Sequence, residues 1–147
     1  MHSGIIIIFN NDEQNIDTNP ILDFLDKNNF KICLVNNAST DKTIEALNKI
    51  KLQANASDNI YILDNSRNKG LKYAVKAGAR FLLNEADFEN MIYLESNIIM
   101  YLKHIEEYFS QIKLQKELLS QYQTRSDRNV LSNVFPFKEL IKMNESC

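Results

Sequence analysis

The chain has 147 residues, a formal net charge of −2 and a hydrophobic fraction of 44%. This length suits one domain, which we expect to span residues 1–147 and to bury roughly two-thirds of its unfolded surface. The sequence pI of about 5.7 gives no electrostatic basis for binding nucleic acid or an anionic membrane.

The two cysteines are Cys33, inside an apolar run, and Cys147, the last residue. They imply no disulfide framework, so a reducing compartment is expected. The apolar run that begins at Ile5 has no basic region before it and is too short for a signal-peptide core or a membrane span. We therefore expect a cytoplasmic protein with no transmembrane segment.

Continuous apolar runs predict four buried strands, because the strands of a parallel sheet that is covered on both faces do not alternate. A fifth stretch, 130–135, fits either a last strand or a loop, and Pro136 should end it. The four runs are 5–9, 32–35, 60–63 and 91–94.

Between these runs, apolar residues recur at helical spacing. The alternation of strands and helices predicts a doubly wound α/β fold, with a mostly parallel sheet of four or five strands and flanking helices. The expected helices are one from Pro20 behind a cap at Thr18 or Asn19, one behind a cap within 39–41, one from near Gly70, one over 98–123 and one over 137–143.

Polar side chains follow each of the four predicted strands. If the strands are parallel, these groups meet at one edge of the sheet, where doubly wound folds bind their ligands. Together they favour a small-molecule pocket over a set of ordinary turns. The groups are Asn10, Asn11, Asp12 and Glu13; Asn36 and Asn37; Asp64, Asn65, Arg67 and Asn68; and Glu95, Ser96 and Asn97.

Several other kinds of site are excluded by the sequence. No glycine-rich dinucleotide motif follows the first strand, and no P-loop occurs. His2 lies near the N-terminus and His104 falls on a predicted helix, so neither indicates a catalytic base. The cysteines and histidines lack the spacing of a zinc site.

The order of segments over residues 5–112 resembles the nucleotide-binding half of the family 2 glycosyltransferases, which have the GT-A fold. The most specific match is the segment 39–43, Ser-Thr-Asp-Lys-Thr, directly after the second strand. The segment 68–70, Asn-Lys-Gly, matches a second family element, which precedes a helix that carries Ala74 and Gly78 here.

Three segments depart from the family's pattern. The segment 8–12 stands where the family has a Pro-x-Tyr-Asn-Glu type of turn, and Asn36-Asn37-Ala38 replaces Asp-Asp-Gly. Glu95-Ser96-Asn97 takes the place of the family's Asp-x-Asp metal motif. Because only one carboxylate remains in that motif, we expect weakened cation binding.

The resemblance implies a hexosyltransferase that uses a nucleotide-diphosphate sugar and inverts the anomeric carbon. It implies a cation, Mn²⁺ or Mg²⁺, held by Glu95 and Asn97 against the diphosphate. Residues two apart on an extended segment point to the same side, which is the geometry expected for this pair. The nucleotide-binding residues that it implies are Asn11, Asp12, Asn36, Asn37, Arg67, Asn68, Lys69 and Gly70.

Two other hypotheses stay open. About fifty residues follow Asn97, so the family's acceptor-binding half is expected to be missing, and no catalytic base can be named. The chain would then be a degenerate, non-catalytic domain that serves as a binding or interaction module. A phospho-receiver domain is the third hypothesis, based on Asp64 and the Asp12-Glu13 pair.

Overall fold

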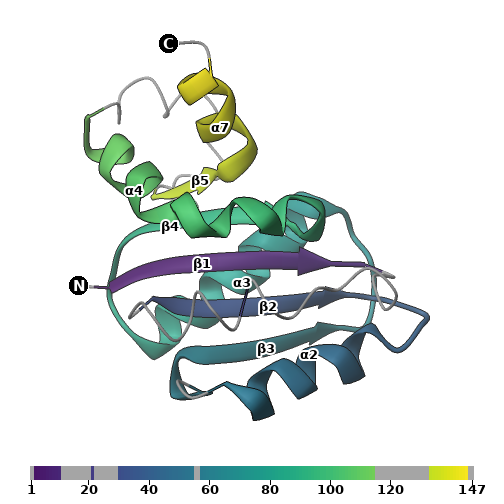
Figure 1. The fold of residues 1–147 in the computed structure, drawn as a ribbon. Helices are drawn as coiled ribbons and strands as arrows, with labels where there is room; N and C mark the ends of the chain where they lie inside the picture. The colour runs from purple at the N-terminus through teal and green to yellow at the C-terminus, as the bar shows by residue number, and fades with distance from the viewer. Residues whose placement is uncertain (1, 11–20, 22–29, 55–56, 115–132, 146–147) are drawn as a thin grey trace.

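The computed structural model describes residues 2–10, 21, 30–54, 57–114 and 133–145. It contains a five-stranded sheet in the order β3-β2-β1-β4-β5, in which every pair of neighbours is parallel (Figure 1). The predicted α/β fold with a mostly parallel sheet is therefore confirmed. The strands are β1 (His2–Phe9), β2 (Lys31–Asn37), β3 (Ile60–Asn65), β4 (Phe88–Glu95) and β5 (Val134–Pro136).

Helices cover both faces of the sheet. In the described part of the chain, α3 packs on one face, and α2, η2, α4 and α7 contribute to the core on the other (Figure 1). This arrangement is doubly wound, as the sequence predicts. The α-helices are α2 (Thr43–Gln53), α3 (Leu71–Glu85), α4 (Ile105–Leu114) and α7 (Phe137–Glu145), and the 3-10 helices are η1 (Ser57–Asn59) and η2 (Ser96–His104).

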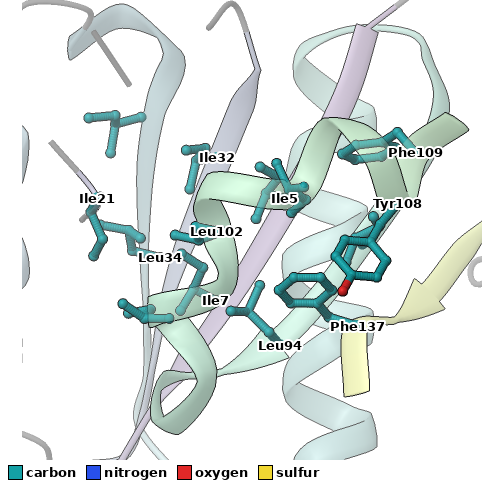
Figure 2. Packing of buried hydrophobic residues seen from close by; sticks show 14 of the residues in the cluster. Ile5, Ile7, Ile21, Ile32, Leu34, Leu94, Leu102, Tyr108, Phe109 and Phe137 are labelled. Atoms are coloured by element: carbon teal, nitrogen blue, oxygen red, sulfur yellow. The ribbon is translucent and has the colours of Figure 1, made fainter. Parts of the chain in front are cut away.

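The central strand β1 explains why its apolar run is continuous. Ile5 and Ile7 point into the core beneath η2, whereas Ile6 and Ile8 point into the core beneath α3, and all four are buried. Figure 2 shows the first of these cores. At one side of it, the rings of Tyr108 of α4 and Phe137 of α7 pack with their centroids 4.9 Å apart and an angle of 82° between their planes. Edge-to-face geometry of this kind is favourable between aromatic rings.

Helix α3 approaches the sheet closely at Gly78. A Cβ built on Gly78 would lie 2.8 Å from Cγ2 of Ile6 and 3.2 Å from Cγ2 of Val35. Both neighbours are fully buried strand residues, so neither has room to move away. The missing side chain therefore sets the distance between α3 and the strands, and with it the position of the loop that precedes α3.

The predicted helix over 98–123 is wrong in its first part. The chain forms the 3-10 helix η2 up to His104, and Ile98 has a non-helical backbone (φ −115°, ψ 21°), before α4 begins. Ile99, Leu102 and Ile105 are buried at intervals of three residues. A 3-10 helix has three residues per turn, so this spacing aligns all three along one line facing the sheet.

The other predicted helices agree with the structure where it describes them. Helices α2, α3 and α7 begin at Thr43, Leu71 and Phe137, close to the expected positions. Within the stretch 130–135, Val134 and Phe135 belong to a strand whose last residue, Pro136, lies on the edge of the sheet, while 130–132 lie outside the described residues. Of the helix predicted from Pro20, only Ile21 is described, and 115–123 also lie outside the described residues.

The strand order decides against one hypothesis. Receiver domains have the order 2-1-3-4-5, in which the third strand is central. In this chain β3, which carries Asp64, lies at the edge of the sheet. The order therefore contradicts the phospho-receiver hypothesis.

Candidate functional site

The strand order reverses between β1 and β4. The chain leaves β1 towards β2 and β3 on one side, whereas β4 and β5 lie on the other, so the loops that follow β1 and β4 diverge and leave a crevice between them. A cavity of about 400 Å³ lies at this point, and we call it the switch-point cavity. Its lining consists of Ile8, Asn10, Asn37, Asn68, Leu71, Glu95, Ser96 and Asn97.

The predicted convergence of strand ends is therefore observed. Asn37 ends β2, Asn68 precedes α3 and Glu95 ends β4, and all three line the same cavity. Parallel pairing produces this convergence, because it brings the carboxyl end of every strand to one edge of the sheet. Asn11 and Asp12, the two residues after β1 that the resemblance implies for nucleotide binding, lie outside the described residues.

Asn37 is the best-defined polar group of the cavity. Its side chain is 4% exposed, its Nδ2 donates to Oδ1 of Asn68 at 3.3 Å, and its backbone oxygen accepts from Nδ2 of Asn10 at 2.6 Å. Its own Oδ1 finds no hydrogen-bond partner among the described residues, although it is buried. Leaving a buried carbonyl oxygen unpaired costs about 1–3 kcal/mol, so a ligand that donates a hydrogen bond here would recover that energy.

Asn36 points away from Asn37, because neighbouring residues of a strand face opposite sides. Its Nδ2 donates to Oδ1 of Asp64 at 2.8 Å, and its Oδ1 accepts from the hydroxyl of Ser39 at 2.5 Å. It does not line the switch-point cavity. In this structure Asn36 ties the ends of β2 and β3 to the turn that follows.

The segment 39–43 forms the entry to α2. Oδ1 of Asp41 accepts from both the backbone N–H of Thr43, at 3.0 Å, and its hydroxyl, at 2.5 Å. The bond from the Thr43 backbone N–H satisfies one of the N–H groups that a helix leaves unpaired at its start. Just before this segment, Ala38 has φ 57°, a left-handed backbone that favours glycine, which is the family's residue there.

The segment 68–70 forms the turn that leads into α3. Oδ1 of Asn68 accepts from the backbone N–H of Gly70 at 2.9 Å, so one side-chain oxygen holds this turn and also contacts Asn37. Gly70 has φ 98°, and no described atom lies within 4 Å of a Cβ built there, so its backbone rather than crowding requires glycine. Arg67 and Lys69 are exposed and do not line the cavity, and Nζ of Lys69 lies 4.9 Å from the ring centre of Tyr73.

The expected geometry of Glu95 and Asn97 is wrong. Glu95 pairs with Ile8 at the end of β4, but η2 begins at Ser96, so the two residues do not share an extended segment. The chain turns here because η2 must cross back over the sheet to bury Ile99. Both Glu95 and Asn97 nevertheless line the cavity.

One carboxylate and one amide oxygen form a small set of ligands for a divalent cation. Among the described residues, no group of three or more His, Cys, Asp or Glu side chains is arranged to hold a metal ion. Mg²⁺ in substrate sites often has only one or two protein carboxylates and takes its remaining ligands from phosphate and water. The residues present therefore fit a cation that is shared with a bound diphosphate.

A second cavity, of about 360 Å³, adjoins the first, with which it shares Leu71, Glu95 and Asn97. Tyr93 of β4 lines it, and burial, then the charges of Glu139 and Glu95, raise the pKa of the Tyr93 phenol. The sequence does not predict this cavity, because no local pattern indicates that the start of α7 lies beside β4. Its remaining lining is Leu94, Ile98, Pro136, Phe137, Lys138 and Glu139.

Comparison with protein families supports the sequence resemblance. The family model for glycosyl transferase family 2 matches residues 3–86, which is more than half of the chain. The chain belongs to glycosyltransferase family 2. The family 2 match begins at the second residue of β1, contains β2, α2, β3 and α3, and ends just before β4 begins at Phe88.

One further comparison and one feature of the helices concern the chain as a whole. No curated protein is similar enough to this family 2 chain to count as a match. Within the described residues, no helix combines the length and the apolar character that crossing a membrane requires. The cytoplasmic location stays a prediction.

Proposed function

We propose that the chain binds a nucleotide-diphosphate sugar in the switch-point cavity and transfers the sugar to an acceptor. The observation that carries the proposal is the buried Oδ1 of Asn37 in that cavity, which has no hydrogen-bond partner among the residues that the structure describes, in a chain of glycosyltransferase family 2. The cavity lies where α/β sheets of this kind bind their ligands. A family 2 domain with this cavity favours a nucleotide-sugar ligand over unrelated small molecules.

In this proposal the nucleobase lies against Asn37. Nucleobases carry N–H groups on the edge used for pairing, and Oδ1 of Asn37 would accept from one of them. An aspartate at this position could only accept, whereas asparagine also donates through Nδ2. In this structure Nδ2 already donates to Oδ1 of Asn68, so Asn37→Asp would lose that hydrogen bond and place a carboxylate against Oδ1 of Asn68.

Glu95 and Asn97 would hold a divalent cation against the diphosphate. Without a cation, the Glu95 carboxylate would repel the diphosphate, since two negative charges would share a partly enclosed cavity. When bound, Mn²⁺ or Mg²⁺ stabilises the negative charge that develops on the leaving diphosphate. Nucleotide binding should therefore depend on the cation, and this dependence should require Glu95.

The transfer itself is a displacement at the anomeric carbon. The acceptor oxygen forms the new bond to this carbon, and the bond between the carbon and the diphosphate oxygen breaks with its electron pair left on the diphosphate. The acceptor proton passes to a base, and the configuration inverts because attack and departure occur on opposite sides of the sugar. The acceptor must therefore approach from the side of the donor sugar that faces away from the diphosphate.

The second candidate function is nucleotide binding without catalysis. The single carboxylate of the metal motif favours it, because the leaving diphosphate would be poorly stabilised. The two candidates share the same cavity, so they differ in turnover rather than in binding. A binding assay followed by a transfer assay separates them.

The binding test measures the melting temperature of the full chain with nucleoside diphosphates and their sugars, with and without Mn²⁺. Ligand at about 100 times its Kd stabilises the folded state by about 2.7 kcal/mol, which raises Tm by several degrees. Glu95→Gln should remove the part of the shift that needs Mn²⁺, and Asn37→Asp should reduce the shift with every nucleoside diphosphate, because the new carboxylate loses its bond to Asn68 and adds a negative charge to the cavity. Glu85→Gln, an exposed residue at the end of α3, is the matched control and should change neither.

The outcomes are distinct. No shift with any nucleotide at millimolar concentration would refute both candidate functions. A shift that depends on Mn²⁺ and Glu95, together with release of nucleoside diphosphate when an acceptor is added, supports the transferase. The same shift with no release from any nucleotide sugar supports the binding module instead.

A further inference from the structure

Strand β3 lies at one edge of the sheet, where β2 is its neighbour (Figure 1). Within the described ranges, no backbone group outside β2 hydrogen-bonds to it. An edge strand leaves the N–H and C=O groups of every second residue pointing outward, where another strand can pair with them. The edge at β3 offers six residues for such pairing, whereas the opposite edge, at β5, offers three.

The middle of this edge is apolar. Tyr61, Ile62 and Leu63 are each half-buried, so the helices on the two faces of the sheet leave the edge partly open to solvent. Tyr61 and Leu63 pack on the α3 side of the sheet, and Ile62 packs on the α2 side. A strand added at this edge would therefore bury more apolar surface on both faces, which is favourable.

Charged side chains at the two ends of β3 form a pattern that is complementary to itself. At the start of the strand, Asp58 is exposed, and Nζ of Lys51 donates to the backbone oxygen of Ile60 at 2.5 Å. At the end of the strand, Asp64 and Arg67 are both exposed. Along the edge, the charges are therefore negative, positive, negative and positive in that order.

An antiparallel copy of β3, paired about Ile62, satisfies this pattern. Two-fold symmetry places Ile60 opposite Asp64 of the second copy, so the Lys51 ammonium beside Ile60 meets a carboxylate. The same contact occurs twice, because the symmetry exchanges the two chains. A parallel copy would instead bring Lys51 beside Lys51 of the second copy, and like charges repel.

A second pair of opposite charges lies outside the first. Pairing about the same centre brings Asp58 next to Arg67 of the second copy. Nζ of Lys31 lies 3.4 Å from the Tyr61 hydroxyl and adds another positive charge at the start of the strand. Lysine on an edge strand commonly opposes pairing, but here both lysines lie at the end that faces a carboxylate. They therefore favour this partner strand over other edges.

We propose that two copies of the chain form a symmetric dimer by antiparallel pairing of their β3 strands, which joins the two five-stranded sheets into one. Two-fold dimers are the commonest assemblies of identical chains, and such an interface must be complementary to itself. This edge meets that condition in its apolar centre and at its charged ends. None of the residues described as lining either cavity belongs to β3, so the dimer does not rest on the proposed function.

The first test is sedimentation equilibrium of the full chain at concentrations up to about 100 μM, the range in which weak dimers form. The wild-type chain should approach twice its monomer mass. Asp58→Arg and Arg67→Asp should each raise the dissociation constant of the dimer about tenfold, because each brings like charges together at two symmetric places. The double variant restores opposite charges and should return the constant close to its original value. Glu107→Arg, an exposed position of α4, is the matched control and should leave it unchanged.

The second test is a disulfide that reports the register. Pairing about Ile62 brings this residue opposite its own copy, with Cα atoms about 5 Å apart, which suits a disulfide. Ile62→Cys, in a chain that also carries Cys147→Ser, should form a covalent dimer under mild oxidation. Leu63→Cys is the matched control, because position 63 faces Tyr61 of the second copy rather than itself. Cys33 is buried and does not interfere.

Three results would overturn the proposal: a monomer over the whole concentration range, a dissociation constant that neither single charge reversal changes, or equal cross-linking of the two cysteine variants. The charge reversals are at exposed positions, so they test the proposal even if cysteine at position 62 weakens the fold, which urea denaturation measures. A dimer that binds no nucleotide leaves this interface standing and refutes the proposed function. A monomer that binds nucleotides does the reverse.

Discussion

Replacing Gly78 by alanine tests the close contact between α3 and the sheet. At an exposed position within a helix, replacing glycine by alanine stabilises the folded protein by about 1 kcal/mol, because alanine has the higher helix propensity and restricts the unfolded chain. Here the new methyl group would lie 2.8 Å from Ile6 and 3.2 Å from Val35. Overpacking of this kind costs about 1–3 kcal/mol, so we expect a net loss of about 1 kcal/mol.

Urea denaturation of the full chain measures this loss as a lower midpoint with an unchanged slope. A double-mutant cycle identifies its cause. With Ile6→Ala, the atom that clashes is gone, so adding Gly78→Ala to that variant should stabilise it, with a coupling of about 2 kcal/mol. If Gly78→Ala raises the stability of the wild-type chain, α3 does not lie as close to β1 as the structure indicates.

Three further predictions concern stability. Ala38→Gly should stabilise the chain by about 0.5–1 kcal/mol, because it relieves the left-handed backbone at φ 57°; a lower urea midpoint would show that the backbone there is unstrained. Asp41→Ala should cost about 1 kcal/mol through loss of the bond to the Thr43 N–H, and Asp41→Asn should cost less; equal losses would show that the oxygen contributes nothing. Burial raises the pKa of Cys33 from 9.0 to about 12, so above pH 9 the thiol ionises in the unfolded chain but not in the folded one. The unfolded state then binds fewer protons, and the free energy of unfolding should fall by about 4 kcal/mol from this group as pH rises from 9 to about 12. Comparing the pH dependence of unfolding with that of Cys33→Ala isolates this group, and identical slopes would contradict its buried, protonated state.

The strands were predictable because most of them are buried on both faces. A continuous run such as that of β1 has few alternatives once its length is too short for a helix. The start of β4 was missed, since Phe88 and Asn90 are buried but Glu89 between them is exposed. There the pattern alternates, and the charged residue hides the beginning of the strand.

The sequence alone predicts that Asn36 and Asn37 have different roles, but not which residue has which role. Adjacent residues of a strand face opposite sides, so only one of the two could line a cavity. Which one does so depends on the layer that covers each face, and that is a tertiary fact. The hydrogen bond from Asn36 to Asp64 decides it in the structure.

The position of Glu139 beside Tyr93 could not be predicted from the sequence. It lies on a helix with an ordinary amphipathic pattern, and nothing near it in the sequence distinguishes it from other glutamates. Its proximity to Tyr93 arises because β5 pairs with β4 and α7 follows β5 directly. Long-range pairing of this kind leaves no local periodicity from which it could be predicted.

The pairing of β1 with β4 joins the family-matched part of the chain to the part beyond it. The first part supplies Asn10, Asn37 and Asn68, the second supplies Glu139, and Glu95 borders both cavities. Protein engineering could therefore replace β5 and α7 with other sequences. This would change the walls of the second cavity, whereas Asn10, Asn37 and Asn68 would keep their positions in the switch-point cavity.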